Sequence, residues 1–316
     1  MGKMMLYCGA VVALAAGVAG GSYSYGGQWG SPGAGNGQFN TPYCAAFAPA
    51  TSYVYVADTL NERIQYFTSS GSYLGQWGGF GNIKGKFHEP WGVAVARNTG
   101  YVYVTDTGHA RIQYFTANGS FLGVWGSYGS GNGQFTSPVG IAVAPGGNVY
   151  VADRGGGRIS YFTATGSFLG RWTGPATPEY LAFSPGGEYL YISFYTHCIR
   201  YYTPTGSLLG EWGSVGTGNG QFWFPYGLSV SDAGLLFVAD SHNQRIQYFG
   251  PTGSYIGQFG VPGSGNGQLQ YPWGVAVRGD GTRAYVVDTV NQRMQYFDAV
   301  AAVRPASLGR IKILLR

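Results

Sequence analysis

One twelve-residue pattern recurs six times along the chain. It reads VADTLNERIQYF at 56–67, with close copies at 104–115, 151–162, 238–249 and 286–297 and a divergent copy at 192–202. The spacings between the central aliphatic residues of successive copies are 48, 47, 40, 47 and 48 residues, for Ile64, Ile112, Ile159, Ile199, Ile246 and Met294. Six units of about 47 residues indicate a repeat architecture, in which each unit buries its apolar face against its neighbours.

Each repeat predicts four short strands. In the second repeat we expect them at Trp91–Ala96, Tyr101–Thr105, Arg111–Phe115 and Phe121–Trp125. The third of these alternates with a period of two, which is typical of a strand, and Asn118-Gly119 after it is a strong hairpin signal. With 56 glycines and 16% aromatic residues, the chain favours many short strands joined by tight turns. We therefore predict an all-β fold, a six-bladed β-propeller of four-stranded antiparallel blades.

The two ends of the repeat region are complementary. The last repeat reaches only its third strand, at Phe297, whereas an unpaired fragment, GGQWG at 26–30, resembles GQWG at 75–78. We expect Gln28–Gly30 to complete the sixth blade and close the ring. The chain then divides into residues 1–20, a single propeller over 23–298 and a tail over 299–316.

The first twenty residues have the features of an export signal. Lys3 precedes an uncharged apolar run over 4–19 that ends in small residues near Gly20, a pattern typical of a signal peptide. A retained N-terminal anchor is the alternative. We expect a secreted, cell-surface or periplasmic protein.

The charge of +5 lies outside the repeats. Lys3 and the tail residues Arg304, Arg310, Lys312 and Arg316 account for all of it, so the repeat region is close to neutral. Because a nucleic-acid reader usually carries a basic face, nucleic acid is an unfavoured partner. Membrane contact is expected only through the N-terminal segment or the basic tail. Cys44 and Cys198 fall in repeats one and four, and no disulfide is expected between them.

The repeat resembles that of the NHL-repeat family. The resemblance rests on the Gly-x-Gly-Gln-Phe linker at 35–39, 131–135 and 218–222, on the proline that follows it, and on the Val-x-Asp…Arg-Ile-Gln-x-Phe segment. It covers most of the chain, although repeat four lacks the linker, the Asp and the Arg. The resemblance implies a six-bladed propeller but no single function, because its members include RNA-binding domains, a peptide-amidating lyase and many exported proteins.

Five repeats contain an Asp and an Arg five residues apart. Repetition in five blades favours a structural ion pair over a catalytic or metal-binding group, since an active site needs residues that occur once. The pairs are Asp58/Arg63, Asp106/Arg111, Asp153/Arg158, Asp240/Arg245 and Asp288/Arg293.

No catalytic set, metal site or cofactor is expected. The resembled lyases use histidines after the first-strand proline as zinc ligands, whereas here those positions hold Tyr43, Trp91, Val139, Glu179, Tyr226 and Trp273. His109 and His242 are expected in exposed turns of different blades.

Four of these post-proline residues are aromatic, and they form the candidate ligand site. Tyr43, Trp91, Tyr226 and Trp273 are expected at one mouth of the central channel, where they either contact a ligand or plug the channel. The favoured hypothesis is an exported scaffold that binds protein or glycan through one propeller face. A channel-centred, metal-dependent lyase or lactonase is the alternative, and an RNA-binding domain is the second alternative. The divergent segment Tyr195–Cys198 is either functional or the result of drift.

Overall fold

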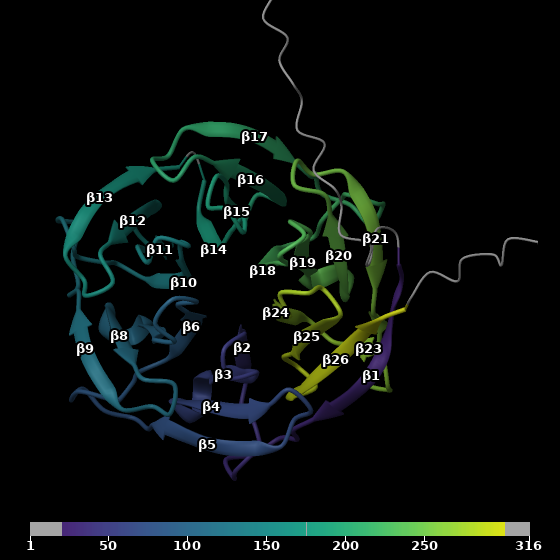
Figure 1. The fold of residues 1–316 in the computed structure, drawn as a ribbon, viewed down its shortest axis with the longest axis horizontal. Helices are drawn as coiled ribbons and strands as arrows, with labels where there is room; N and C mark the ends of the chain where they lie inside the picture. The colour runs from purple at the N-terminus through teal and green to yellow at the C-terminus, as the bar shows by residue number, and fades with distance from the viewer. Residues whose placement is uncertain (1–20, 175, 301–316) are drawn as a thin grey trace, which may run out of the picture.

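The structure, a computed structural model, describes residues 21–174 and 176–300. Within them the chain forms six four-stranded antiparallel sheets arranged as blades around a central axis (Figure 1). The predicted fold class is confirmed. Among the described residues, no helix has the length and apolarity needed to cross a membrane. The expected export segment and residues 301–316 of the expected tail lie outside the described residues.

Each blade runs outward from the axis in chain order, except the sixth. Blade 1 contains β2 (Pro42–Ala48), β3 (Tyr53–Asp58), β4 (Arg63–Thr68) and β5 (Tyr73–Gly78), and blade 2 contains β6 (Pro90–Val95), β7 (Val102–Asp106), β8 (Arg111–Phe115) and β9 (Phe121–Trp125). Blade 3 contains β10 (Pro138–Val143), β11 (Val149–Asp153), β12 (Arg158–Phe162) and β13 (Phe168–Thr173), and blade 4 contains β14 (Pro178–Phe183), β15 (Leu190–Phe194), β16 (Cys198–Tyr202) and β17 (Leu208–Trp212). Blade 5 contains β18 (Pro225–Val230), β19 (Leu236–Asp240), β20 (Arg245–Phe249) and β21 (Tyr255–Phe259), and blade 6 contains β24 (Pro272–Val277), β25 (Arg283–Asp288), β26 (Arg293–Ala299) and β1 (Tyr23–Trp29).

A proline begins every innermost strand. It has no N–H to donate, so the start of a strand is a position where it disturbs no ladder. In blade 2 the first two strands, at 90–95 and 102–106, lie one residue away from their predicted bounds. The third and fourth strands agree with the prediction.

The N-terminal strand closes the ring, as predicted. β1 pairs with β26 in antiparallel register from Tyr23 opposite Ala299 to Trp29 opposite Met294, with a bulge near Gly26. The paired segment is longer than the predicted Gln28–Gly30 fragment, and β26 continues to Ala299, beyond the expected end at Phe297. The longer register joins the two ends of the repeat region by six residue pairs.

In five of the six blades, a tryptophan of the outermost strand packs on the next blade. The indole of Trp77 lies against Gly119 in the turn between β8 and β9, so that a Cβ on this glycine would lie 2.6 Å from Cε3 of the indole. Gly119 also has a φ of +87°, which side-chain-bearing residues seldom adopt. The same contact joins Trp29 to Gly71, Trp125 to Gly166, Trp172 to Gly206 and Trp212 to Gly253. This contact explains why the repeat keeps both residues.

We expect Gly119→Ala to lower the free energy of unfolding by about 2 kcal/mol, because it adds backbone strain and an overpacked methyl group. Urea unfolding followed by tryptophan fluorescence measures the loss. Gly146→Ala is the control, because a Cβ there meets nothing within 4 Å. Equal losses in the two variants would show that the contact with Trp77 contributes nothing.

The propeller has two different faces. On the first, which we call the linker face, the linkers between blades lie beside the turns between second and third strands; the backbone N–H of Leu60, for example, donates to the carbonyl of Asn40. The turns between first and second strands and those between third and fourth strands lie on the opposite face. The described chain begins and ends on the opposite face, where the Tyr23 hydroxyl donates to the carbonyl of Gly281 and the Val300 N–H donates to that of Ser22.

Candidate functional site

The five Asp/Arg pairs all form, and each binds its blade to the preceding linker. In blade 1, Nε of Arg63 donates to Asp58 over 2.7 Å, while its two Nη groups donate to the carbonyls of Ala34, Gly35 and Gln38. The corresponding Nε–carboxylate distances in blades 2, 3, 5 and 6 are 2.6, 2.9, 2.7 and 2.7 Å. All five carboxylates are buried, so they are not available to a ligand.

Blade 4 has lost this arrangement as a unit. Phe194 and Cys198 stand opposite each other where the other blades pair Asp with Arg. The connection from Thr173 to Pro178 is also too short for a Gly-x-Gly-Gln-Phe linker. The arginines of the other blades bind linker carbonyls, so the loss of the linker and the loss of the Asp/Arg pair belong together. Cys198 and Cys44 are buried and free, as expected.

The four post-proline aromatics come together on the axis. Trp273 is stacked between Tyr43, at 4.3 Å between ring centroids, and Tyr226, at 4.4 Å. Trp91 meets Tyr43 edge-on at 4.8 Å. The sequence left open whether these rings contact a ligand or plug the channel. Because both faces of Trp273 are covered by neighbours, the geometry favours the plug.

A buried carboxylate lies beside this aromatic cluster. Glu179 is fully buried, and neither of its oxygens has a hydrogen-bond partner. Nε of Arg154 lies 3.4 Å from its Oε1, and the same guanidinium lies 5.6 Å from the ring of Trp91. Burial raises the pKa of Glu179 to about 7, and Arg154 opposes this shift only in part. Buried carboxylates without a hydrogen bond are rare, which makes this residue the strongest candidate for chemistry in the described chain.

The channel is closed beneath the aromatic cluster. Tyr180 reaches from blade 4 to blade 1, where its hydroxyl donates to the carbonyl of Tyr43 over 3.4 Å. Its ring is buried, and burial raises the pKa of its hydroxyl well above the usual value. The aromatic cluster and Tyr180 together separate the linker face from the interior of the ring.

Sequence reasoning missed Arg154. Arg154 directly follows Asp153. At the position that corresponds to Arg154, four of the other blades carry Thr or Ser. The Thr59 hydroxyl, for example, donates to the carbonyl of Pro90. Aligning the repeats position by position shows Arg154 and Glu179 as residues that occur once, and this is the signal that could have found them. The residues at the position of Arg154 in the other blades are Thr59, Thr107, Ser241 and Thr289.

The histidines do not form a metal site within 21–174 and 176–300, where no three His, Cys, Asp or Glu residues are placed to hold an ion. His109 and His242 lie in the turns between the second and third strands of blades 2 and 5, as expected, and both side chains are half-buried. His109 lies 3.0 Å from the buried Asp106, and His242 packs on Phe224 with ring centroids 4.6 Å apart.

The family of the repeat is independently identified. The NHL repeat family matches residues 87–115, 135–162 and 222–249, which lie in blades 2, 3 and 5. No curated protein sequence is significantly similar to the chain.

Solved propellers of several activities share the fold at low identity. A gluconolactonase from Xanthomonas campestris is 18% identical with a TM-score of 0.62, over 83% of this chain and 87% of that one. The hydrazine synthase of Kuenenia stuttgartiensis is 12% identical with a TM-score of 0.61, over 83% and 97%. A streptogramin B lyase is 17% identical with a TM-score of 0.58, over 82% and 94%. At such identities the likeness shows the fold alone. The chain is a six-bladed β-propeller in which three segments, in blades 2, 3 and 5, match the NHL repeat.

Proposed function

We propose that the protein is a binding module that docks a protein partner on its linker face. The observation that carries the proposal is where the large exposed apolar side chains lie. Within the described residues, Val300, beside the end of β26, is the one of them that lies on the opposite face outside the strands. Nine lie in the linkers and turns of the linker face: Leu60, Phe80, Ile83, Tyr128, Tyr195, Val215, Trp223, Val261 and Val290.

The most exposed of these side chains stand on the linkers. Phe80, Ile83, Tyr128 and Val215 are 74%, 71%, 76% and 63% exposed. Exposed apolar side chains on one face support a protein interaction surface there, and aromatic residues are enriched at such surfaces. A glycan is the less favoured ligand, because the rings nearest the axis are stacked on one another. RNA is less favoured because the repeat region as a whole is close to neutral.

Site-specific photo-cross-linking in the producing cells tests the proposal. A photoreactive phenylalanine analogue at Phe80 or Tyr128 should give a discrete adduct with the same protein. Leu122 on β9 is the control, because it is also exposed but lies on the outer edge of a blade. Equal labelling from all three positions would contradict the proposal, and an RNA adduct from the linker positions would support the nucleic-acid alternative.

We propose further that the module is exported, because residues 1–20 have the pattern of a signal peptide. The mature N-terminus, determined on protein recovered outside the cytoplasm, should lie near Gly20. Recovery of the protein only from the cytosol would contradict export.

An enzyme is the second candidate, and Glu179 is the observation that favours it. A carboxyl with a pKa near neutrality can act as a general acid or base at physiological pH, and a gluconolactonase and a streptogramin lyase share the fold. Turnover of lactones or cyclic depsipeptides that Glu179→Gln abolishes would support this candidate, as would stoichiometric zinc or calcium in the purified protein. Absence of turnover with both substrate classes would count against it.

A further inference from the structure

Four of the linkers contain an exposed Asn-Gly pair in the same local sequence. The pairs start at Asn36, Asn132, Asn219 and Asn266, and each stands within Gly-Asn-Gly-Gln. All four asparagines are exposed, and the glycines that follow them have φ values of +75° or +76°. Because glycine has no Cβ, its backbone nitrogen can approach the side-chain carbonyl carbon of the preceding asparagine. The four pairs therefore share their sequence, their backbone conformation and their chemistry.

A buried glutamine binds the glycine in three of these pairs. The side-chain oxygen of Gln65 accepts a hydrogen bond from the backbone N–H of Gly37 over 2.8 Å, and the side-chain amide of Gln65 donates to the carbonyl of Gln38 over 2.7 Å. The linker is thus held directly at the Asn-Gly pair. The bond to the glycine N–H recurs at 2.9 Å between Gly220 and Gln247 and between Gly267 and Gln295, and all three glutamines are fully buried.

Blade 3 lacks this hydrogen bond. Ser160 occupies the position in β12 that glutamine holds in blades 1, 5 and 6, opposite the corresponding valine of the second strand. Its side chain is shorter, and within the described residues the backbone N–H of Gly133 donates to no acceptor. Arg158 still binds the carbonyl of Ser130, so the linker stays on the blade although its Asn-Gly pair is not held.

The chain has one further Asn-Gly pair, Asn118-Gly119 in the turn between β8 and β9. There the backbone N–H of Gly119 donates to the carbonyl of Thr116 over 3.0 Å. Among the Asn-Gly pairs of the described residues, the pair at Asn132 is therefore the one whose glycine N–H has no partner.

We propose that Asn132 is a site of spontaneous deamidation, selected among the Asn-Gly pairs by the serine at position 160. The backbone nitrogen of Gly133 gives up its proton to solvent and bonds to Cγ of Asn132, and the side-chain nitrogen takes up a proton and leaves as ammonia. Water then opens the succinimide ring, at the side-chain carbonyl to give aspartate or at the main-chain carbonyl to give isoaspartate. No group is oxidised or reduced. At the other pairs the glycine nitrogen must first leave its hydrogen-bond acceptor, which slows the same reaction.

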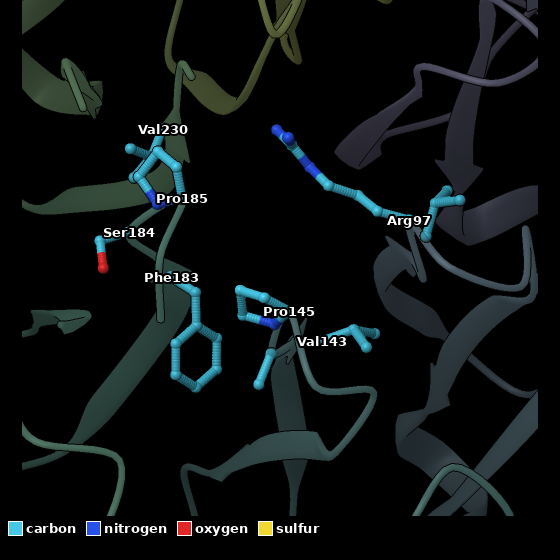
Figure 2. Close-up of a pocket in the computed structure, with 9 residues that line it drawn as sticks. Arg97, Val143, Pro145, Phe183, Ser184, Pro185 and Val230 are labelled. Carbon is cyan, nitrogen blue, oxygen red and sulfur yellow. The ribbon is translucent and has the colours of Figure 1, made fainter. Parts of the chain in front are cut away.

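The modification changes the charge of the linker face only. Asn132 lies in the linker between β9 and β10, which also carries Tyr128, and deamidation replaces its neutral amide by a carboxylate. The opposite face has an open pocket among Pro145, Phe183 and Arg97 (Figure 2), where Arg97 pairs with the half-exposed Asp232. The charges at that pocket are unchanged.

Peptide mass spectrometry of the full chain, aged at mildly alkaline pH, tests the site by measuring aspartate and isoaspartate at each Asn-Gly pair. In the folded protein Asn132 should deamidate about three- to tenfold faster than Asn36, Asn219 and Asn266, the factor expected from one hydrogen bond. In concentrated urea the four rates should become equal, because the four local sequences are the same. A preference for Asn132 that persists in urea would overturn the proposal, since the structure would then play no part.

Two reciprocal variants test the role of the buried side chain. Ser160→Gln supplies the missing acceptor and should slow deamidation of Asn132 to the rate of the other three pairs. Gln247→Ser removes an acceptor and should accelerate deamidation of Asn219 about three- to tenfold, with Asn132 in the same protein as the internal reference. Unfolding midpoints establish that each variant is folded. Equal rates at the four pairs of the folded wild type, an unchanged rate at Asn132 in folded Ser160→Gln, or an unchanged rate at Asn219 in folded Gln247→Ser would each overturn the proposal.

Discussion

Asp58→Ala is expected to lower the free energy of unfolding by about 3–5 kcal/mol, the usual cost of removing one partner from a buried ion pair. The carboxylate of Asp58 accepts hydrogen bonds from the backbone N–H of Asn40, the amides of Asn61 and Gln65, and Nε of Arg63. Its loss leaves a nearly buried guanidinium without a counter-charge and removes the hydrogen bond that the linker N–H of Asn40 donates to the hairpin. Urea unfolding measures the effect.

A second substitution, at Arg63, completes a double-mutant cycle that separates the effect of the uncompensated charge from the effect of lost packing. Arg63→Met removes the uncompensated cation, so the double variant should recover part of the stability that Asp58→Ala loses. The control is Asp232→Ala, which breaks an exposed ion pair and should cost less than about 1 kcal/mol. A loss at Asp58 no larger than the loss at Asp232 would mean that the repeated pairs do not hold the linkers.

Glu179→Gln is expected to remove a pH dependence of about 3 kcal/mol from the stability of the protein. The pKa of Glu179 is raised from 4.5 to about 7 in the folded state. Between these values the folded protein holds a proton that the unfolded chain has released, so stability falls as the pH rises. Below pH 4.5 the Glu179 carboxyl is protonated in both the folded and the unfolded protein. Above about pH 7 it is ionised in both, so the loss of stability is then complete. The magnitude follows from the difference between the two pKa values.

The measurement is the free energy of unfolding of both proteins at pH 4.5 and pH 8. Other groups titrate alike in the two proteins, so the difference between them isolates Glu179. The stability of the variant relative to the wild type should increase by about 3 kcal/mol between the two pH values. Glu188→Gln in the same blade is the control, because Glu188 is exposed. Parallel pH dependences for the wild type and Glu179→Gln would contradict a raised pKa of the buried Glu179 carboxyl.

The repeat by itself determined the architecture. The period of the Ile64 to Met294 series gives six units, and the alternation within each unit gives its strands, because both are local properties of the chain. Ring closure by the strand around Trp29 was also predictable, since the fragment missing from the last blade is present at the beginning. The Asp/Arg pairs were predictable because the residues are five positions apart on one hairpin.

Only the tertiary structure decided what surrounds the axis. Glu179 and Arg154 come from adjacent blades, Arg97 and Asp232 from opposite ones, and Tyr180 crosses from blade 4 to blade 1. No sequence period relates such residues, because they meet through the closure of the ring and the direction of each side chain. For the same reason, the sequence placed the aromatics at the channel mouth but left open whether they would stack on one another or face a ligand. Local periodicity specifies the blades, whereas contacts between blades depend on packing at the axis, where each side chain must fit those from the other five.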